Sequence, residues 1–134
     1  MTKAEKAKKV LSEKNIRPSV VRIGVLDYLL SNRTHPPADE IYRALEKKIL
    51  TLSKTSVYNT LKLLAENDII KVIDIDQQQV RYDGYAEFHG HFKCEKCNMI
   101  YDMDVSEPKE SLNGFLIKNK EVYYYGTCNH CAVR

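Results

Sequence analysis

Apolar residues in the first half of the chain recur at helical spacing, and the breaks between them predict separate helices. Residues 3–14 are charged and helix-favouring, with few apolar positions, and predict a short helix or a basic arm. Pro18 is placed to open the next helix, whose apolar residues recur along one face; they are Val21, Val25, Leu26, Leu29 and Leu30. Pro37 can begin a third helix, with Ile41 and Leu45 on its buried side.

A fourth helix is predicted from Lys54 to Glu66, with Ser53 as its N-cap. Its apolar side is formed by Val57, Leu61 and Leu64. The opposite side offers a cation, a phenol, an amide and a hydroxyl, which are groups that contact base edges and phosphates; they belong to Thr55, Tyr58, Asn59 and Lys62. Taken alone, such a side is more typical of an ordinary solvated helix face.

The pattern then changes from helix to strand. Residues 69–75 and 80–83 read as two strands around a turn at residues 76–79, which predicts a β-hairpin. Three helices followed by a hairpin form a winged helix-turn-helix, whose second motif helix enters the DNA major groove. We therefore interpret residues 1–83 as a winged-helix DNA-binding domain.

The second half of the chain follows a hinge at residues 84–88 and is dominated by predicted strands. These strands cover residues 88–93, 99–104, 115–118 and 122–127. Ser106 can cap a short helix that ends at Asn113-Gly114. The expected fold class is α+β, with a small α/β dimerisation domain at residues 89–134.

Length and charge are compatible with two small domains of different character. The chain has 134 residues and a net charge of +3. Residues 1–66 carry 13 Lys and Arg against 7 Asp and Glu, a net +6, and residues 67–134 carry 8 against 11, a net −3. A basic first half suits a polyanion, although a charge of this size also fits ordinary solvated surface. The charged N-terminus and the lack of a long apolar run lead us to expect a cytoplasmic protein.

Two C-x2-C knuckles are the most specific signal in the sequence. They supply Cys94, Cys97, Cys128 and Cys131. Four thiolates suit a tetrahedral, structural zinc ion, which would tie the end of the chain to its central strands. Two disulfides are the alternative, and reducing conditions disfavour them. His130, between two of the cysteines, is expected to be a solvated turn residue.

A second, mixed-ligand metal site is predicted from single residues. His89 and His91 share one face of a predicted strand, because side chains alternate along a strand. Asp102 lies on the following strand, Asp83 ends the hairpin, and His35 stands at a helix N-terminus. Three imidazoles and two carboxylates suit iron, manganese or zinc. Each residue taken singly is more typical of surface or capping chemistry, but one ion bound by all five would fix the orientation of the two halves.

At these residues the chain resembles the ferric uptake regulator (Fur) family over nearly its whole length. The matching stretches are residues 35–42, 56–61 and 81–83, the His89-Gly90-His91 pair and the two knuckles. Within the family it is most similar to the peroxide-sensing repressors (PerR). Iron sensors usually have glutamate in place of Asp102 and commonly have arginine in place of Asn59.

The resemblance implies a homodimeric transcriptional repressor that binds pseudo-palindromic, double-stranded operator DNA. It also implies ferrous iron or manganese, held by His35, Asp83, His89, His91 and Asp102. In the iron form, peroxide adds an oxygen to a ligand histidine, by analogy His35 or His89, and the protein releases DNA. Such a protein is a sensor and not an enzyme, because the reaction consumes its own side chain.

Departures of the sequence from the family include the start of the second helix and the length of a C-terminal segment. Ser19-Val20-Val21 stands before Arg22, where the family often has Thr-Pro-Gln. The segment between Asp102 and Cys128 is short for the family's dimerisation helix.

Three alternative functions remain open from the sequence. The first is an iron- or zinc-responsive repressor of the same family without peroxide chemistry. The second is a non-haem iron oxygenase, which uses a similar ligand set, although a chain of this size leaves little room for a substrate pocket. The third is a zinc-stabilised DNA-binding module with no regulatory metal.

Overall fold

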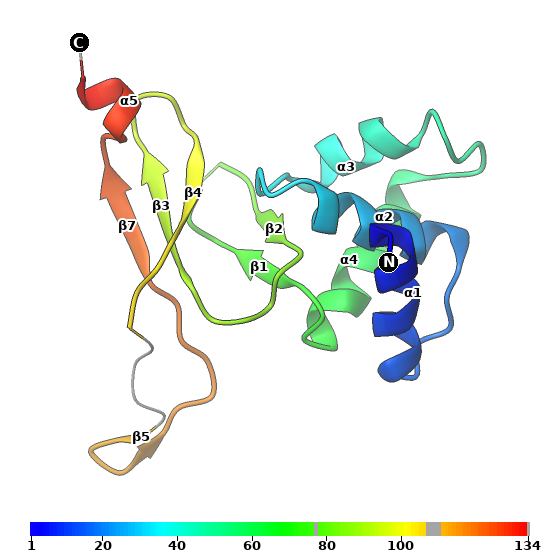
Figure 1. Cartoon of the computed structure of the whole chain (residues 1–134), viewed down its shortest axis with the longest axis horizontal. Coiled ribbons are helices and arrows are strands. Elements are labelled where there is room, and N and C mark those ends of the chain that lie inside the picture. Colours follow the sequence, from blue (N-terminus) through cyan, green and yellow to red (C-terminus); the bar gives the residue numbers. More distant parts are fainter. Residues whose placement is uncertain (77, 107–110, 134) are drawn as a thin grey trace. The chain divides into compact units, whose positions relative to one another are not determined.

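The computed structural model describes residues 1–76, 78–106 and 111–133 (Figure 1). The chain divides into two compact units, Met1–Ala86 and Glu87–Arg134. Each unit has its own secondary structure, helical in the first and mainly strands in the second. Within the described residues, no helix has both the length and the apolar character that crossing a membrane requires.

Four helices build the first unit, and their starts follow from capping residues. They are α1 (Lys3–Glu13), α2 (Val20–Ser31), α3 (Ala38–Leu45) and α4 (Lys54–Glu66). The predicted cap of α4 is confirmed, since the Ser53 hydroxyl accepts a hydrogen bond from the Ser56 backbone. The predicted start of α2 at Pro18 is too early. Ser19 caps this helix by accepting from the Arg22 backbone, so Pro18 lies outside it.

The apolar faces of α1, α2, α3 and α4 pack together and form the core of the first unit. The α2 stripe is buried as predicted, except that Val21 is only half-buried at the edge of the core. The largest fully buried side chains of the helices are Leu11, Val25, Leu26, Leu29, Ile41, Val57, Leu61 and Leu64. Burying these faces is the main source of stability for helices of this length.

A short antiparallel hairpin follows α4. Its strands are β1 (Lys71–Ile73) and β2 (Arg81–Asp83), which are shorter than the sequence predicts. The backbone N–H of Tyr82 donates to the Pro36 carbonyl, so β2 also holds the loop between α2 and α3. Four helices and this wing confirm a winged-helix fold for the first unit.

The second unit is organised around a three-stranded sheet. Its central strand is β3 (Gly90–Cys94), which pairs antiparallel with β4 (Ile100–Met103) and parallel with β7 (Tyr123–Gly126). A separate hairpin consists of β5 (Ser111–Leu112) and β6 (Phe115–Leu116). A four-residue helix, α5 (Asn129–Ala132), follows β7, and no pattern in the sequence predicts it.

The helix predicted between Ser106 and Gly114 is wrong at its C-terminal end. Ser111–Leu112 form a strand, and Asn113 and Gly114 make the tight turn to β6 with φ angles of +52° and +81°. Two central residues with positive φ are typical of a hairpin turn, and Asn-Gly is its strongest sequence signal. Residues 107–110 of the predicted helix lie outside the described residues.

Gly84 allows β2 to approach α2 closely. A Cβ atom at this position would lie 2.9 Å from both the carbonyl carbon and the oxygen of Leu29, which are backbone atoms. Helical backbone cannot yield as a flexible side chain does. The residue after the wing must therefore lack a side chain.

We expect Gly84→Ala to lower the free energy of unfolding by about 1–3 kcal/mol, the usual range for overpacking. Urea unfolding followed by far-UV circular dichroism measures this loss. Gly24→Ala is the matched control, because its added methyl would meet mainly the end of the Ile49 side chain at 3.2 Å. An equal loss of unfolding free energy in both variants would contradict a special need for glycine at position 84.

Candidate metal centres and DNA-binding face

The two cysteine knuckles are brought together by the sheet. Cys94 is the last residue of β3, and the turn after it is closed by the Asn98 N–H, which donates to the Cys94 carbonyl at 2.9 Å. Cys94 pairs in register with Gly126 on β7, two residues before Cys128. The parallel β3–β7 pairing therefore places the second knuckle beside the first.

The four sulfur atoms have the spacing of a metal site. They all lie within 4.8 Å of one another, and the Sγ atoms of Cys97 and Cys128 are 3.9 Å apart. A tetrahedral zinc ion with Zn–S bonds of about 2.3 Å separates its sulfur ligands by roughly 3.8 Å. All four cysteines are free thiols and not two disulfides. The donor set and its spacing therefore fit zinc.

Hydrogen bonds to the sulfur atoms favour negative charge at this group. The backbone N–H groups of Cys128 and Cys97 donate to Cys94 Sγ at 3.3 and 3.5 Å, and lower the pKa of this thiol to about 6. Hydrogen bonding to the Cys128 sulfur raises the pKa of Cys131 to about 12 and that of Tyr101 to about 12. The low pKa at Cys94 favours its thiolate, whereas the high pKa at Cys131 keeps a proton on that thiol, which a bound cation would displace.

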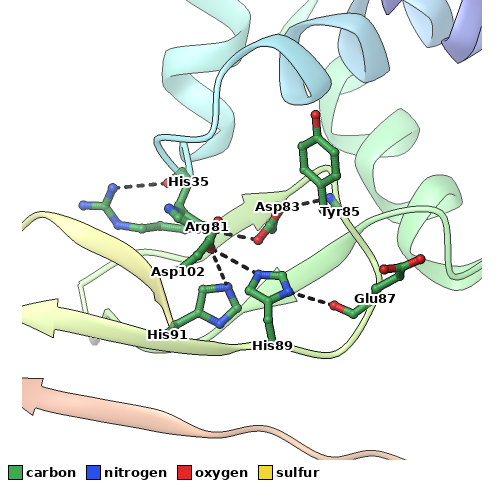
Figure 2. Close-up of polar contacts among 8 residues, drawn as sticks. All are labelled: His35, Arg81, Asp83, Tyr85, Glu87, His89, His91 and Asp102. Carbon is green, nitrogen blue, oxygen red and sulfur yellow. Dashed lines mark hydrogen bonds and ion pairs between the residues drawn. The ribbon is translucent and has the colours of Figure 1, made fainter. Parts of the chain in front are cut away.

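Three of the other predicted ligands form one group in the second unit (Figure 2). His91 on β3 pairs in register with Asp102 on β4, so the two side chains share a face of the sheet. His89 lies just before β3, two residues from His91. Asp102 Oδ1 is 3.1 Å from His89 Nε2 and 3.6 Å from His91 Nε2.

The hydrogen bonding of His89 suits a cation at its other ring nitrogen. Its Nδ1 lies 2.7 Å from the Glu87 carbonyl and must donate there, because a carbonyl only accepts. In the neutral ring, Nε2 then carries a lone pair and faces the Asp102 carboxylate. Two acceptors facing each other call for a proton or a metal ion between them.

The remaining two predicted ligands form a buried pair in the first unit. His35 Nε2 lies 3.5 Å from Asp83 Oδ2, and the side chains are only 2% and 3% exposed. The other Asp83 oxygen, Oδ1, accepts from the Tyr85 backbone at 2.9 Å (Figure 2). The facing imidazole and carboxylate offer one nitrogen and one oxygen donor, and such donors suit a divalent transition-metal ion. The five predicted ligands therefore form two imidazole–carboxylate groups, one in each unit.

The polar side of α4 is exposed, as the sequence predicts. Its four predicted DNA-contacting residues are all solvent-accessible: Thr55, Tyr58, Asn59 and Lys62. A hollow of about 330 Å³ is lined by Asn59, Lys62 and, from α2, Arg22. The Tyr58 hydroxyl donates to Asp39 Oδ1 on α3 at 3.3 Å, a contact that helical periodicity could not reveal.

Comparisons with known proteins agree with these features. The sequence profile of the ferric uptake regulator family matches residues 13–125. The peroxide operon regulator of Bacillus subtilis (strain 168) is 31% identical over 134 aligned residues, which cover 96% of this chain and 92% of that protein.

Two solved structures with related sequences share the fold. PerR from Streptococcus pyogenes is 30% identical, with a TM-score of 0.57, and the match covers 98% of this chain and 94% of that one. The Campylobacter jejuni peroxide stress regulator is 28% identical, with a TM-score of 0.72, and the match covers 98% and 100%. With most of its length matched by the family profile, the chain belongs to the ferric uptake regulator family, whose members are metal-responsive transcriptional repressors.

Proposed function

We propose that this protein is a homodimeric repressor that senses peroxide by oxidation of one of its own metal-binding histidines and then releases operator DNA. The observation that carries the proposal is the ligand set, three imidazoles and two carboxylates, with Asp102 directly opposite His91 in the sheet. Aspartate at this position and the similarity to peroxide regulators favour this branch of the family over the iron- and zinc-responsive ones.

In this proposal Cys94, Cys97, Cys128 and Cys131 hold a structural zinc ion. Four protein ligands leave no open position for a reacting molecule, which is typical of a structural site. The ion would fasten the end of β3 to the start of α5 and so stabilise the second unit. Such small sheets often depend on their metal for folding.

We further propose that His35, Asp83, His89, His91 and Asp102 bind one regulatory ion, ferrous iron or manganese. Imidazole and carboxylate ligands suit both ions. Because two of the ligands belong to the first unit and three to the second, the bound ion would restrict how the units are oriented. In a homodimer, a fixed orientation gives the two α4 helices the spacing that two half-sites of a pseudo-palindromic operator require.

Ferrous iron, when bound, would activate peroxide, and peroxide itself would be the two-electron oxidant of a neighbouring side chain. One peroxide oxygen would insert into a ring C–H bond of the His35 or His89 imidazole, and the other would leave as water. The oxidised ring is a poorer metal ligand, so the orientation of the units is no longer fixed. DNA affinity then falls because metal binding and DNA binding are coupled.

The first test is peptide mass mapping after a brief peroxide pulse. We expect one added oxygen, 16 Da by mass, on His35 or His89 in the ferrous protein and none in the manganese protein. The manganese form is the matched control, since it has the same ligands without the same redox chemistry. Histidines left intact, with only cysteine or methionine oxidised, would contradict peroxide sensing and favour a reversible iron or zinc sensor.

The zinc assignment predicts different effects for neighbouring residues of the second knuckle. Cys131→Ser should lose the tightly bound zinc and destabilise the sheet of the second unit, as measured by metal analysis and limited proteolysis. His130→Ala is the control and should retain the zinc, because His130 is exposed and not in the group of four sulfurs. Full zinc content in Cys131→Ser would refute the four-cysteine site.

The DNA-binding face predicts a change in salt dependence. Lys62→Ala should weaken binding of the manganese-loaded protein to duplex DNA and reduce the slope of log K against log salt by about 1, the effect of losing one phosphate contact. Lys47→Ala, an exposed lysine outside α4, should leave the slope unchanged. Fluorescence anisotropy at several salt concentrations measures both. An unchanged slope in Lys62→Ala would show that Lys62 makes no phosphate contact.

A further inference from the structure

A nearly buried ion pair lies inside the wing of the first unit. The guanidinium of Arg81 on β2 donates from Nε and Nη2 to Asp76 Oδ2, at 3.2 and 3.1 Å. The second oxygen of Asp76 accepts from the Gln78 backbone at 3.0 Å. Asp76 is 6% exposed and Arg81 is 16% exposed. This pairing fixes the plane and direction of the guanidinium group.

The remaining nitrogen of that guanidinium reaches the loop that carries His35. Arg81 Nη1 donates to the His35 carbonyl at 3.2 Å (Figure 2). The next residue along β2 binds the same loop, through the Tyr82 N–H and the Pro36 carbonyl at 3.1 Å. Two adjacent residues of β2 therefore hold two adjacent carbonyls of the loop.

The backbone of His35 needs such restraint. Its φ angle is +58°, in the left-handed region that residues with a side chain rarely adopt. Backbone in this region persists only where surrounding contacts hold it, and it is concentrated at functional sites. The ring direction of His35 depends on this backbone, because its side chain is buried and points toward Asp83.

We propose that Arg81, oriented by Asp76, is a positioning residue that fixes the His35 imidazole for binding of the regulatory metal. The inference rests on the proposed function, in which His35 and Asp83 are ligands. Strand β2 then supplies one ligand directly, Asp83, and fixes the other through the guanidinium of Arg81. Arg81 itself binds no metal.

The competing explanation is that the Asp76–Arg81 pair only stabilises the wing. In that case its loss would weaken metal binding whether or not His35 is a ligand. If Arg81 acts through His35, its loss has no further effect once the imidazole is gone. A double-mutant cycle separates the two explanations, because it measures whether two residues act through each other.

The experiment measures Mn²⁺ affinity of the full-length, zinc-containing protein from the free Mn²⁺ signal in electron paramagnetic resonance. The variants are Arg81→Lys, His35→Ala and the double variant, with Arg43→Lys as the matched control on the exposed side of α3. Lysine keeps the charge but lacks the planar fork that bonds two acceptors at once. We expect about a 10-fold weaker affinity in Arg81→Lys, as for other residues that orient metal ligands, and no change in Arg43→Lys.

In the His35→Ala background, Arg81→Lys should cause no further loss of Mn²⁺ affinity. If Arg81→Lys lowers Mn²⁺ affinity equally with and without His35, Arg81 has only a structural role and the positioning role is overturned. A normal Mn²⁺ affinity in His35→Ala would overturn the five-ligand site itself, whereas a loss there with a normal Arg81→Lys would overturn only the role of Arg81.

Asp76→Asn is a second, independent variant of the same contact. It keeps an acceptor for Arg81 but removes the charge that orients the guanidinium. We expect the same dependence on His35, at unchanged zinc content and far-UV circular dichroism. A loss of Mn²⁺ affinity in Asp76→Asn that persists in the His35→Ala background would count against the proposal.

Discussion

Strand β3 is hydrogen-bonded on both sides, and both groups of candidate metal ligands in the second unit depend on that pairing. Its antiparallel partner places Asp102 opposite His91, and its parallel partner leads directly into the second cysteine knuckle. A shift of one residue in the register would turn the paired side chains to opposite faces of the sheet. An ion that holds the end of β3 at Cys94 would therefore also protect the pairing of His91 with Asp102, so the proposed structural zinc would help to form the proposed regulatory site.

The two proposed sites differ in how completely their ligands would enclose an ion. Four sulfur ligands would enclose an ion completely, and backbone hydrogen bonds to the Cys94 and Cys128 sulfurs lower the pKa of both thiols. The second ligand set is divided between two structural units and includes His89 and Asp102, which are partly exposed. If one ion binds the whole second set, as proposed, this division would suit regulation, because losing one ligand could release one unit without unfolding the other.

Local patterns predicted much of the fold. Helical spacing, the Ser53 cap, the wing and the cysteine knuckles could all be read from neighbouring residues. The failures have different causes. Asn-Gly occurs both after helices and in hairpin turns, and here it closes a hairpin, whereas α5 is too short to give a periodic signal. The contact between Arg81 and His35 joins residues 46 positions apart and depends on a positive φ angle, so no local pattern predicts it.

The division of the ligands sets the energy scale of the proposed switch. To move two orientations from a 1:99 to a 99:1 ratio, an ion must bind one of them about 10⁴-fold more tightly, or about 5.5 kcal/mol. That difference can come only from ligands that the ion gains when the units are correctly oriented. If the three residues of the second unit bind the ion in every orientation, His35 and Asp83 must supply it between them. In the proposed switch, losing either ligand would then cause a large shift toward the unrestricted state. Oxidation of the His35 imidazole alone would be sufficient, and the contacts that orient His35 would be part of the switch.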